Sequence, residues 1–545
     1  MILINRISGS ARLKGVLSWQ PILGVAIATS LIRLRLLGIP LERDEGEYAY
    51  IAQLILKGIP PYLTAYSMKL PGIFFAYALN MSIFGQSIEG IHLGLIFVNV
   101  ATIMLVFVLA KRLFGLYGGL VAGASFAVLA LGKTVLGLTA NSEHFVLLPV
   151  MAGLLLLLRA IDIQKGRAFL LSGLFFGLAF LVKQHGVFFI LFGIFYIFWA
   201  HRAIRRVSWA QTVKNALSFG MGSLVPFAVT CVVFYRIGIF DKFWFQTFTY
   251  ARSYIEYASF YTAISSFLWT FNDVVRTSPF LWALAVVGLV SVFLEREARA
   301  NAVFFIGFFI TSFAVITPGL YFRNHYFILV LPAVSFLIAV AAHAGQRLLA
   351  NSRTFGRSAI AISMLLFILA AGHSIFSQRE FLFRMNPTEA SRDMYGPHLS
   401  PFPETAAVAS YIKEHSSKSD SVVVMGSEPQ IYFYLDRPAP TGYLYAYFLT
   451  EQHPYYLKMQ DEFIKDVEKA SPRYLVYLRS WNSEFVSKDA FMRLYKWYEN
   501  YKMSYDIVGI ADIISKDRTE YRWGEDAKNY THRGKLYVLV FKRKP

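Results

Sequence analysis

The sequence predicts a polytopic α-helical membrane protein with about eleven transmembrane helices and a C-terminal α/β or α+β domain. Of the 545 residues, 56% are hydrophobic and only 16% are charged, and the mean hydropathy is +0.47. This balance is too apolar for a water-soluble globular chain or a disordered one. The charge divides the chain into two domains, because residues 1–376 carry a net charge of +17 and residues 377–545 carry +2.

The transmembrane helices are predicted from apolar runs in the first of these domains. A hydrocarbon core about 30 Å thick requires about 20 apolar residues per helix, and runs of that length or slightly less recur. The predicted spans are 17–38, 88–110, 116–134, 143–160, 168–182, 186–200, 215–236, 280–294, 301–317, 325–343 and 357–376.

Basic residues between the spans predict the orientation. With the N-terminus in the cytoplasm, the inner segments contain 17 Lys and Arg residues, Arg6, Arg12 and Lys14 among them, and the outer segments contain nine. Lys and Arg resist translocation, so this bias places the C-terminal domain outside the cytoplasm. The basic start and the apolar stretch after it resemble a secretory signal, but no small-x-small cleavage motif follows that stretch, and we expect an uncleaved first helix.

The excess positive charge could also indicate nucleic-acid binding, but the basic residues fall between apolar runs and form no patch with interleaved aromatics. The lipid bilayer explains them better, and no nucleic-acid partner is predicted. The single cysteine, Cys231, excludes an intramolecular disulfide.

Two outer segments are too long to be simple connections. Segment 40–87 contains two short amphipathic stretches, at 45–56 and 73–84, and apolar residues at helical spacing in the first predict a helix in the plane of the interface. Segment 237–279 is rich in Tyr, Phe and Trp, which is typical of an aromatic belt at headgroup depth.

The C-terminal domain shows short apolar runs rich in β-branched and aromatic residues. Strands are predicted at 421–425, 474–478 and 536–541, and helices at 406–414 and 460–470.

Three carboxylates, Asp44, Glu45 and Glu47, directly follow the first span. Carboxylates at a membrane boundary are costly unless they are solvated or functional. Two interpretations stay open: solvated acids that favour the dipole of a helix N-terminus, or a general base that faces an outer cavity and activates an acceptor hydroxyl.

Lys69 begins the sequence K-L-P-G at 69–72 in the same outer segment. It could bind an anionic headgroup or phosphate as a point charge. It could also only extend its side chain to the interface.

Three further polar groups lie at the outer ends of later spans, on one predicted face, and are compatible with one wet cavity. They comprise Asn141, Glu143 and His144; Lys183, Gln184 and His185; and Arg323, Asn324, His325 and Tyr326. Any single one of these histidines is more often a structural hydrogen-bonding residue than a ligand. Glu143 with the three histidines could bind a divalent cation, but their spacing does not require one, so no metal ligands are assigned.

These residues fall in motifs that resemble a known family. DEGEYAYIAQLILKGIPPY at 44–62, KLPG at 69–72 and IFG at 83–85 are similar to the first extracytoplasmic loop of bacterial GT-C glycosyltransferases of the protein O-mannosyltransferase and aminoarabinose lipid A transferase group. The similarity extends over most of the chain, through NSEHF at 141–145, GLAFLVKQHG at 177–186, RNHYFILVLP at 323–332 and SEPQIYFYLDRP at 427–438.

The resemblance implies a GT-C fold, a polyprenyl-phosphate-linked sugar as donor, and inversion at the anomeric carbon. It also implies a reaction on the outer face of the cytoplasmic (inner) membrane, with a glycolipid, polysaccharide or protein of the cell envelope as acceptor. The family's catalytic aspartate matches Asp44, and its phosphate-contacting lysine matches Lys69. Two departures are KLPG in place of KPPG, and Glu47 near the position where the aminoarabinose enzymes have an arginine, which argues against assuming the same donor sugar.

The chemistry of this reaction suits the residues. A polyprenyl phosphate leaves as a stabilised anion, so the protein supplies cations around it and one base for the acceptor hydroxyl. We expect Asp44 to be the base and Glu45 to orient the acceptor or support Asp44. We expect the donor phosphate to be bound by Lys69, with Arg323, Lys183 or His185 around it, and the C-terminal domain to cap the cavity and help select the acceptor.

Two other classes stay open on the sequence. A transporter or flippase of a lipid-linked saccharide would also have many spans, although we find no inverted repeat or matching pair of Gly/Pro-broken spans. A non-catalytic assembly factor would use the C-terminal domain as a binding module and would not need Asp44.

Overall fold

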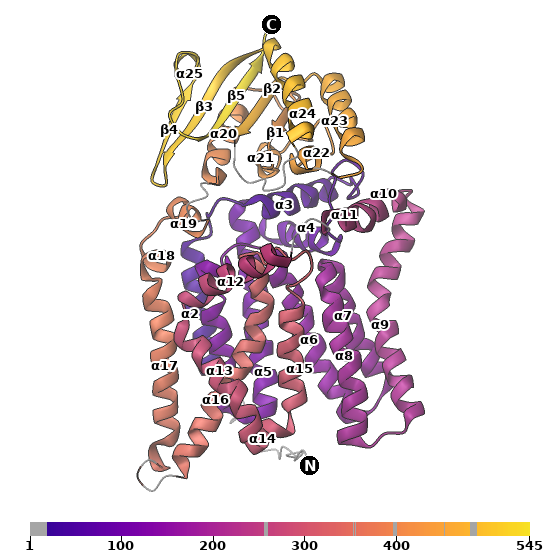
Figure 1. Cartoon of the computed structure of the whole chain (residues 1–545), viewed down its shortest axis with the longest axis vertical. Coiled ribbons are helices and arrows are strands. Elements are labelled where there is room, and N and C mark those ends of the chain that lie inside the picture. The colour runs from indigo at the N-terminus through magenta and orange to yellow at the C-terminus, as the bar shows by residue number, and fades with distance from the viewer. Residues whose placement is uncertain are drawn as a thin grey trace.

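Long apolar helices form a bundle, and a mixed β-sheet with its own helices sits on one end of this bundle (Figure 1). The structure is a computed structural model that describes residues 19–255, 260–351, 354, 356–395, 400–451, 453–479 and 488–545. The basic residues Arg6, Arg12 and Lys14, on which part of the predicted orientation rests, lie outside the described residues.

The bundle is built from helices that coincide with the apolar runs of the sequence. They are α2 (Gln20–Arg35), α5 (Ile88–Leu129), α6 (Ser142–Ile163), α7 (Gly166–Val182), α8 (Val187–Trp199), α9 (Trp209–Arg236), α13 (Pro279–Leu294), α15 (Ala302–Ala314), α16 (Leu331–Ala350) and α17 (Ala359–Ser377). Short 3-10 and π turns extend or join them: η1 (Lys133–Val135), η2 (Gln184–Gly186), η3 (Ala200–Arg205), η5 (Asn324–Val330) and η6 (Gly356–Ser358).

These helices make the chain a multi-pass membrane protein, but the predicted count of eleven spans is not confirmed. Within the described residues, six helices are long and apolar enough to cross a membrane, and a seventh is added if the pair Tyr261–Arg276 and Pro279–Leu294, bent by 108°, is one span. One reason for the difference is α5, which contains two predicted spans divided at Gly115, where a φ of 72° breaks the helix. Another is that α7 and α15 are apolar but short.

The first outer segment forms α3 (Arg43–Leu56) and α4 (Gly72–Phe84), which lie across the end of the bundle beneath the sheet domain (Figure 1). α3 begins with a capping box, in which the Glu42 and Glu45 side chains each accept from the other's backbone N–H. All residues from 45 to 54 are buried. The predicted interfacial helix is therefore covered on its polar side as well, because the sheet domain packs on it.

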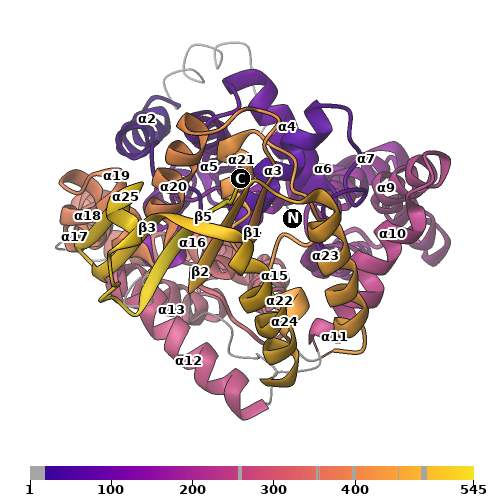
Figure 2. The ribbon, with the colours of Figure 1, turned by 90° about the horizontal axis from the view of Figure 1, so that it is seen from above.

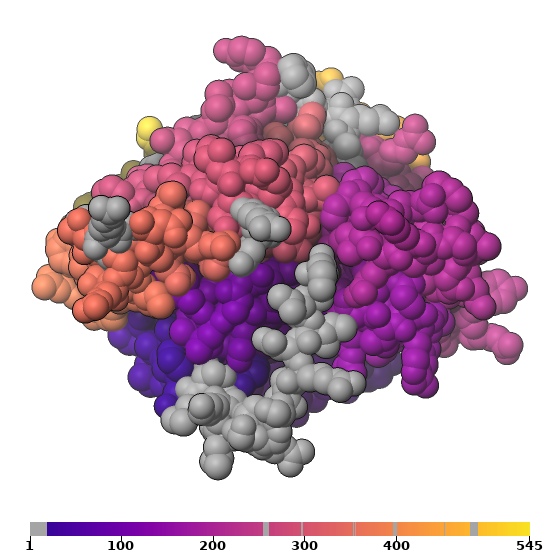
Figure 3. Space-filling model, turned by 90° about the horizontal axis from the view of Figure 1, so that it is seen from below, coloured from indigo at the N-terminus to yellow at the C-terminus, as the bar shows by residue number. Residues whose placement is uncertain are grey.

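The second outer segment forms α10 (Phe240–Trp244), η4 (Phe245–Tyr250), α11 (Ala251–Ile255) and the longer α12 (Phe260–Arg276). α10 and α11 lie at the level of α3 and α4, whereas α14 (Arg296–Ala300), which comes later in the chain, lies at the opposite end of the bundle (Figure 1). Figure 3 shows this opposite end of the bundle from below. Its surface is formed by segments coloured from indigo to orange, which are far apart in the sequence.

The C-terminal sheet has the strand order β1-β2-β5-β3-β4. β1 (Val422–Met425) and β2 (Tyr474–Arg479) are parallel, and β5 (Leu536–Arg543), β3 (Tyr505–Ser515) and β4 (Arg518–Trp523) pair antiparallel. The three predicted strands and both predicted helices are confirmed, whereas β3 and β4 were not predicted. The domain's helices are α18 (Arg379–Phe383), α19 (Pro387–Met394), α20 (Phe402–Glu414), α21 (Gln430–Leu435), α22 (Tyr447–Thr450), α23 (Tyr456–Ala470), α24 (Lys488–Tyr501), η7 (Lys502–Ser504) and α25 (Glu525–Lys528).

The sheet domain is bonded to the start of α3. Arg43 pairs with Glu428 at 3.1 Å, and the Leu41 backbone N–H donates to the Tyr434 hydroxyl at 2.9 Å. A Cβ atom on Gly46 would lie 2.6 Å from the backbone nitrogen of Gln430, so only glycine permits α21 to approach α3 so closely. Figure 2 shows the same arrangement from above, with α21 over α3 and with α9, α10 and α12 toward the edge.

Candidate active site

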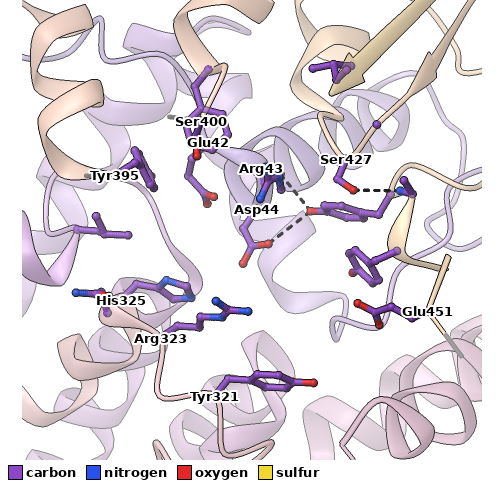
Figure 4. Close-up of a pocket in the computed structure, with 18 of the residues that line it drawn as sticks. Glu42, Arg43, Asp44, Tyr321, Arg323, His325, Tyr395, Ser400, Ser427 and Glu451 are labelled. Carbon is purple, nitrogen blue, oxygen red and sulfur yellow. Dashed lines mark hydrogen bonds between the residues drawn. The ribbon is translucent and has the colours of Figure 1, made fainter. Parts of the chain in front are cut away.

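A cavity of about 1490 Å³ lies between the end of the helix bundle and the sheet domain. Its wall includes Asp44 of α3, Lys69 of the loop before α4, and Arg323 and His325 around the start of η5. The sheet domain contributes Tyr445 and other residues. In Figure 4, Asp44, Arg323 and His325 point into this cavity from different elements.

Asp44 and Lys69 form an ion pair in the wall of the cavity, with Lys69 Nζ 3.4 Å from Asp44 Oδ2. Both side chains keep about a quarter of their surface exposed, 25% and 22%, so a ligand in the cavity can reach them. Burial raises the pKa of Asp44, but the charges of Lys69, His325 and Lys183 outweigh burial and lower this pKa to about 2. Asp44 is therefore ionised throughout the physiological pH range.

The K-L-P-G sequence holds Lys69 in place. Its backbone N–H donates to Ser67 Oγ at 3.2 Å, and its carbonyl accepts from the Tyr62 hydroxyl at 2.8 Å. Pro71 is the N-cap residue of α4, and a Cβ atom on Gly72 would lie 2.5 Å from the Leu181 carbonyl oxygen. The glycine thus lets α4 begin against the end of α7, directly before Lys183.

Glu143, Lys183, His325 and Tyr326 come together next to this pair, although they lie on three separate segments. Lys183 forms an ion pair with Glu143, and His325 Nε2 lies 4.0 Å from Glu143 Oε1. Lys183 Nζ also sits 4.2 Å from the centre of the Tyr326 ring, a cation–π distance. Buried charges require such partners, and Glu143 and Lys183 satisfy each other behind Asp44 and Lys69.

Of the remaining predicted residues, Arg323 lines the cavity, whereas His185 and His144 do not. Arg323 is exposed in the cavity and lies 5.4 Å from the Tyr321 ring centre. His185 packs edge-on against Tyr326 at 5.4 Å, and neither His185 nor the buried His144 is among the residues that line the cavity.

Glu45 is placed away from the cavity. Its carboxylate lies 3.0 Å from His92 Nε2 and accepts from the backbone N–H groups of Glu42 and Ala140, and its side chain is fully buried. The expectation that Glu45 orients the acceptor is not supported by this placement. Contacts to His92 and to the Ala140 backbone hold the Glu45 carboxylate on the side of α3 away from the cavity.

Two residues beside Asp44 were not predicted as site residues. The Tyr445 hydroxyl lies 3.1 Å from Glu47 Oε2, 3.5 Å from Asp44 Oδ1 and 3.1 Å from the Arg43 carbonyl oxygen. Glu47 follows Asp44 by three positions, and this spacing was available from the sequence as a shared helix face. Tyr445 had no local signal, because it lies 401 positions from Asp44.

The far end of the cavity is lined by aromatic and basic residues of the sheet domain. They are Tyr477, Arg479, Tyr495, Tyr498, Lys502 and Tyr537. No group of three or more His, Cys, Asp or Glu side chains within the described ranges is placed to hold a metal ion.

Comparisons with known proteins agree with this architecture. Residues 68–233 match the family model described as dolichyl-phosphate-mannose-protein mannosyltransferase. The fold is similar to ArnT from Cupriavidus metallidurans bound to undecaprenyl phosphate, with a TM-score of 0.54 and 17% identity over 95% of this chain and 97% of that chain. It is also similar to the archaeal oligosaccharyltransferase AglB from Archaeoglobus fulgidus in complex with an inhibitory peptide and a dolichol-phosphate, with a TM-score of 0.51 and 12% identity over 92% and 74%. No curated protein sequence matches the chain.

The fold is therefore the GT-C fold of integral-membrane glycosyltransferases, which ArnT and AglB share. The expected resemblance to the mannosyltransferase and ArnT group is confirmed by the family model and by these structures together.

Proposed function

We propose that the protein is an integral-membrane glycosyltransferase that moves a sugar from a polyprenyl-phosphate donor to a cell-envelope acceptor. The observation that carries this proposal is the pair of Asp44 and Lys69, 3.4 Å apart and exposed to one large cavity. A carboxylate base beside a cation is what transfer from a lipid phosphate requires. The polyprenyl phosphates bound to ArnT and AglB support the same class of donor.

In the proposed reaction, Asp44 accepts the proton of the acceptor hydroxyl while its oxygen attacks the anomeric carbon. The bond from that carbon to the phosphate oxygen breaks, and the electron pair leaves with the phosphate. Attack from the face opposite the phosphate inverts the anomeric carbon. The proposed reaction assigns no residues as ligands of a divalent cation.

Of the cations expected from the sequence to bind the donor phosphate, Lys69 and Arg323 line the cavity, so we assign them to that phosphate. Lys183 pairs with Glu143 behind the wall and contributes at longer range. We therefore assign the direct contacts with the donor phosphate to Lys69 and Arg323. Lys183 and His185 are supporting residues that do not contact the phosphate.

The sheet domain supports a role in acceptor selection. Its Tyr477, Tyr498 and Tyr537 rings offer apolar faces with polar edges, and Arg479 and Lys502 add positive charge in the same cavity. Such a surface suits the alternating apolar and hydroxylated faces of a sugar. The proposed position of the site is the outer face of the cytoplasmic membrane, with a cytoplasmic N-terminus.

The test compares purified wild type with Asp44→Asn in liposomes, each given a panel of polyprenyl-phosphate sugars. Release of polyprenyl phosphate is measured with and without membrane-extract acceptors. The matched control is Asp436→Asn, which removes another lysine-paired carboxylate, bonded to Lys57 at 2.5 Å outside the cavity.

We expect release by wild type and Asp436→Asn and none by Asp44→Asn. Equal release by all three would remove Asp44 as the base. Movement of the unchanged lipid across the bilayer, without a glycosylated product, would instead indicate a transporter or flippase.

A further inference from the structure

Glu47 is a buried carboxylate beside the site that the proposed reaction does not use. Its side chain is only 1% exposed, and it lies one helical turn after Asp44 on the same face of α3. The Tyr445 hydroxyl, itself on a residue only 2% exposed, connects the two carboxylates, at 3.1 Å from Glu47 and 3.5 Å from Asp44. In Figure 4 a dashed line marks the bond that reaches Asp44 from this hydroxyl.

Tyr445 is held firmly in this position. The next backbone N–H, that of Ala446, donates to Ser427 Oγ at 3.1 Å and to the Gly426 carbonyl at 2.9 Å. The Tyr445 ring packs against Phe448 and Tyr447, with ring centres 5.9 and 4.9 Å away. The hydroxyl therefore stays between the carboxylates without rearrangement of the sheet domain.

The two carboxylates differ strongly in basicity. Burial raises the pKa of Glu47 to about 7, against the opposing charge of Lys69, whereas the pKa of Asp44 is lowered to about 2. A proton on Asp44 is therefore much more acidic than one on Glu47. The groups that face Glu47 are Asp44 and Tyr48 of α3, Tyr62, Ser67 and Lys69 of the following loop, and Tyr445 of the sheet domain.

We propose that Tyr445 and Glu47 form a proton path that removes the acceptor's proton from Asp44 after sugar transfer. The inference rests on the proposed function, because it takes Asp44 as the base. Protonated Asp44 donates to the Tyr445 oxygen while the Tyr445 O–H proton passes to Glu47 Oε2. One O–H bond breaks and one forms at the tyrosine, so its charge is unchanged, Asp44 is again a carboxylate and Glu47 is a neutral acid.

In this path the sheet domain takes part in proton transfer. Tyr445 is supplied by the domain that covers the cavity, and Asp44 by the helix beneath it. The path is complete only when the two are docked. Tyr445 and Glu47 act through Asp44 and do not contact the substrate in this scheme, so they are positioning residues.

The test measures steady-state release of polyprenyl phosphate over many turnovers from pH 5.5 to 9, because regeneration of Asp44 limits only the turnovers after the first; Asp44 begins each turnover ionised over this range. The variants are Glu47→Gln, which cannot accept the proton, and Tyr445→Phe, which removes the bridge. The control is Tyr434→Phe, which also loses a hydroxyl bonded between the sheet domain and the start of α3, at Leu41, but does not touch the carboxylates. Thermal unfolding of each variant verifies that it is folded.

In the wild type we expect the rate to fall as the pH drops below about 7, because Glu47 must be ionised to accept a proton. Glu47→Gln and Tyr445→Phe should each lower the rate by about ten- to a hundredfold, near the lower range of general-base effects, and abolish this pH dependence. Tyr434→Phe should keep both the rate and the pH dependence.

If Tyr445→Phe keeps the wild-type pH profile, the path is overturned. The rate would then still depend on the ionisation of Glu47 without the Tyr445 hydroxyl, and Tyr445 would have only a structural role. If Glu47→Gln does not fold, the rate and the pH profile of Tyr445→Phe are sufficient to test the path. Failure of the path and failure of the proposed function are distinguishable, because activity of Asp44→Asn contradicts the function, whereas an inactive Asp44→Asn with unaffected Tyr445→Phe contradicts only the path.

Discussion

Lys69 Nζ lies 3.4 Å from Asp44 Oδ2, although Asp44 is in the first turn of α3 and Lys69 follows 25 positions later, in the loop before α4. The pair places a cation beside the proposed base before any ligand is bound. A donor phosphate would share Lys69 with Asp44, so binding of the donor also changes the surroundings of the base.

Replacement of Lys69 by alanine should weaken donor use. A hydrogen bond between charged groups contributes about 1.5–3 kcal/mol, which corresponds to about a ten- to hundredfold increase in the donor KM. Lys69→Arg should keep part of the affinity because it keeps the charge. Initial rates against donor concentration measure this effect, and an unchanged donor KM in Lys69→Ala would remove Lys69 from the phosphate site.

Loss of Lys183 should destabilise the fold. Lys183→Met leaves the buried Glu143 carboxylate without its lysine partner, and breaking a buried pair costs about 3–5 kcal/mol. The double variant Lys183→Met/Glu143→Leu should recover most of this loss, because it removes both charges. Thermal unfolding in detergent compares them, with Lys57→Met of the exposed Lys57–Asp436 pair as control. Equal stability of Lys183→Met and the control would contradict the expectation.

Gly46→Ala should loosen the contact between the sheet domain and α3. The added Cβ atom would lie 2.6 Å from the Gln430 backbone nitrogen, so α21 must move away. We expect faster proteolytic separation of the sheet domain and a loss of transfer activity. The control is Gly24→Ala, where a Cβ atom meets nothing within 4 Å. Identical digestion of both variants would show that the contact does not hold the domains together.

The ion pair of Asp44 predicts a pH dependence of stability. The pKa of Asp44 is about 2 in the folded protein and about 3.9 for an unperturbed aspartate. The stabilisation is therefore fully present above about pH 4 and is lost as the pH falls through about 2. The difference in unfolding temperature between wild type and Asp44→Asn should narrow from pH 7 to pH 2.5. If the difference in unfolding temperature stays constant, the charge of Asp44 does not stabilise the folded protein.

Truncation before about residue 385 should abolish transfer. It removes Tyr445, the Glu428 partner of Arg43, and one wall of the cavity. The helix bundle should still insert into the membrane, which is verified by membrane fractionation. Full activity and unchanged acceptor preference of the truncated chain would exclude a part for the sheet domain.

The sequence anticipated the parts of the molecule whose physical signal is local. Apolar runs identified the bundle helices, and the K-L-P-G and acidic motifs identified Lys69 and Asp44. The burial of Glu45 could not be predicted, because its partners His92 and the Ala140 backbone are far away in the sequence. Strands β3 and β4 have no continuous apolar run: β4 alternates charged residues with Thr519, Tyr521 and Trp523 at the edge of the sheet, and Asp506, Gly509 and Asp512 interrupt β3.

The contacts that complete the site could not be inferred from spacing. Tyr445 meets Glu47 across 398 positions, and Arg43 meets Glu428 across 385. Such pairs form only when the sheet domain docks on α3, and the close approach of Gln430 to Gly46 in that contact has no periodic signal in the sequence.

The docking of the sheet domain on α3 has a consequence for biosynthesis. Asp44 and Lys69 leave the ribosome early, and Tyr445 and Glu428 leave it after all the bundle helices. A nascent chain therefore carries an uncovered carboxylate and lysine for most of its synthesis, without the residues that close the cavity. The cavity therefore acquires its second wall only once translation is nearly finished.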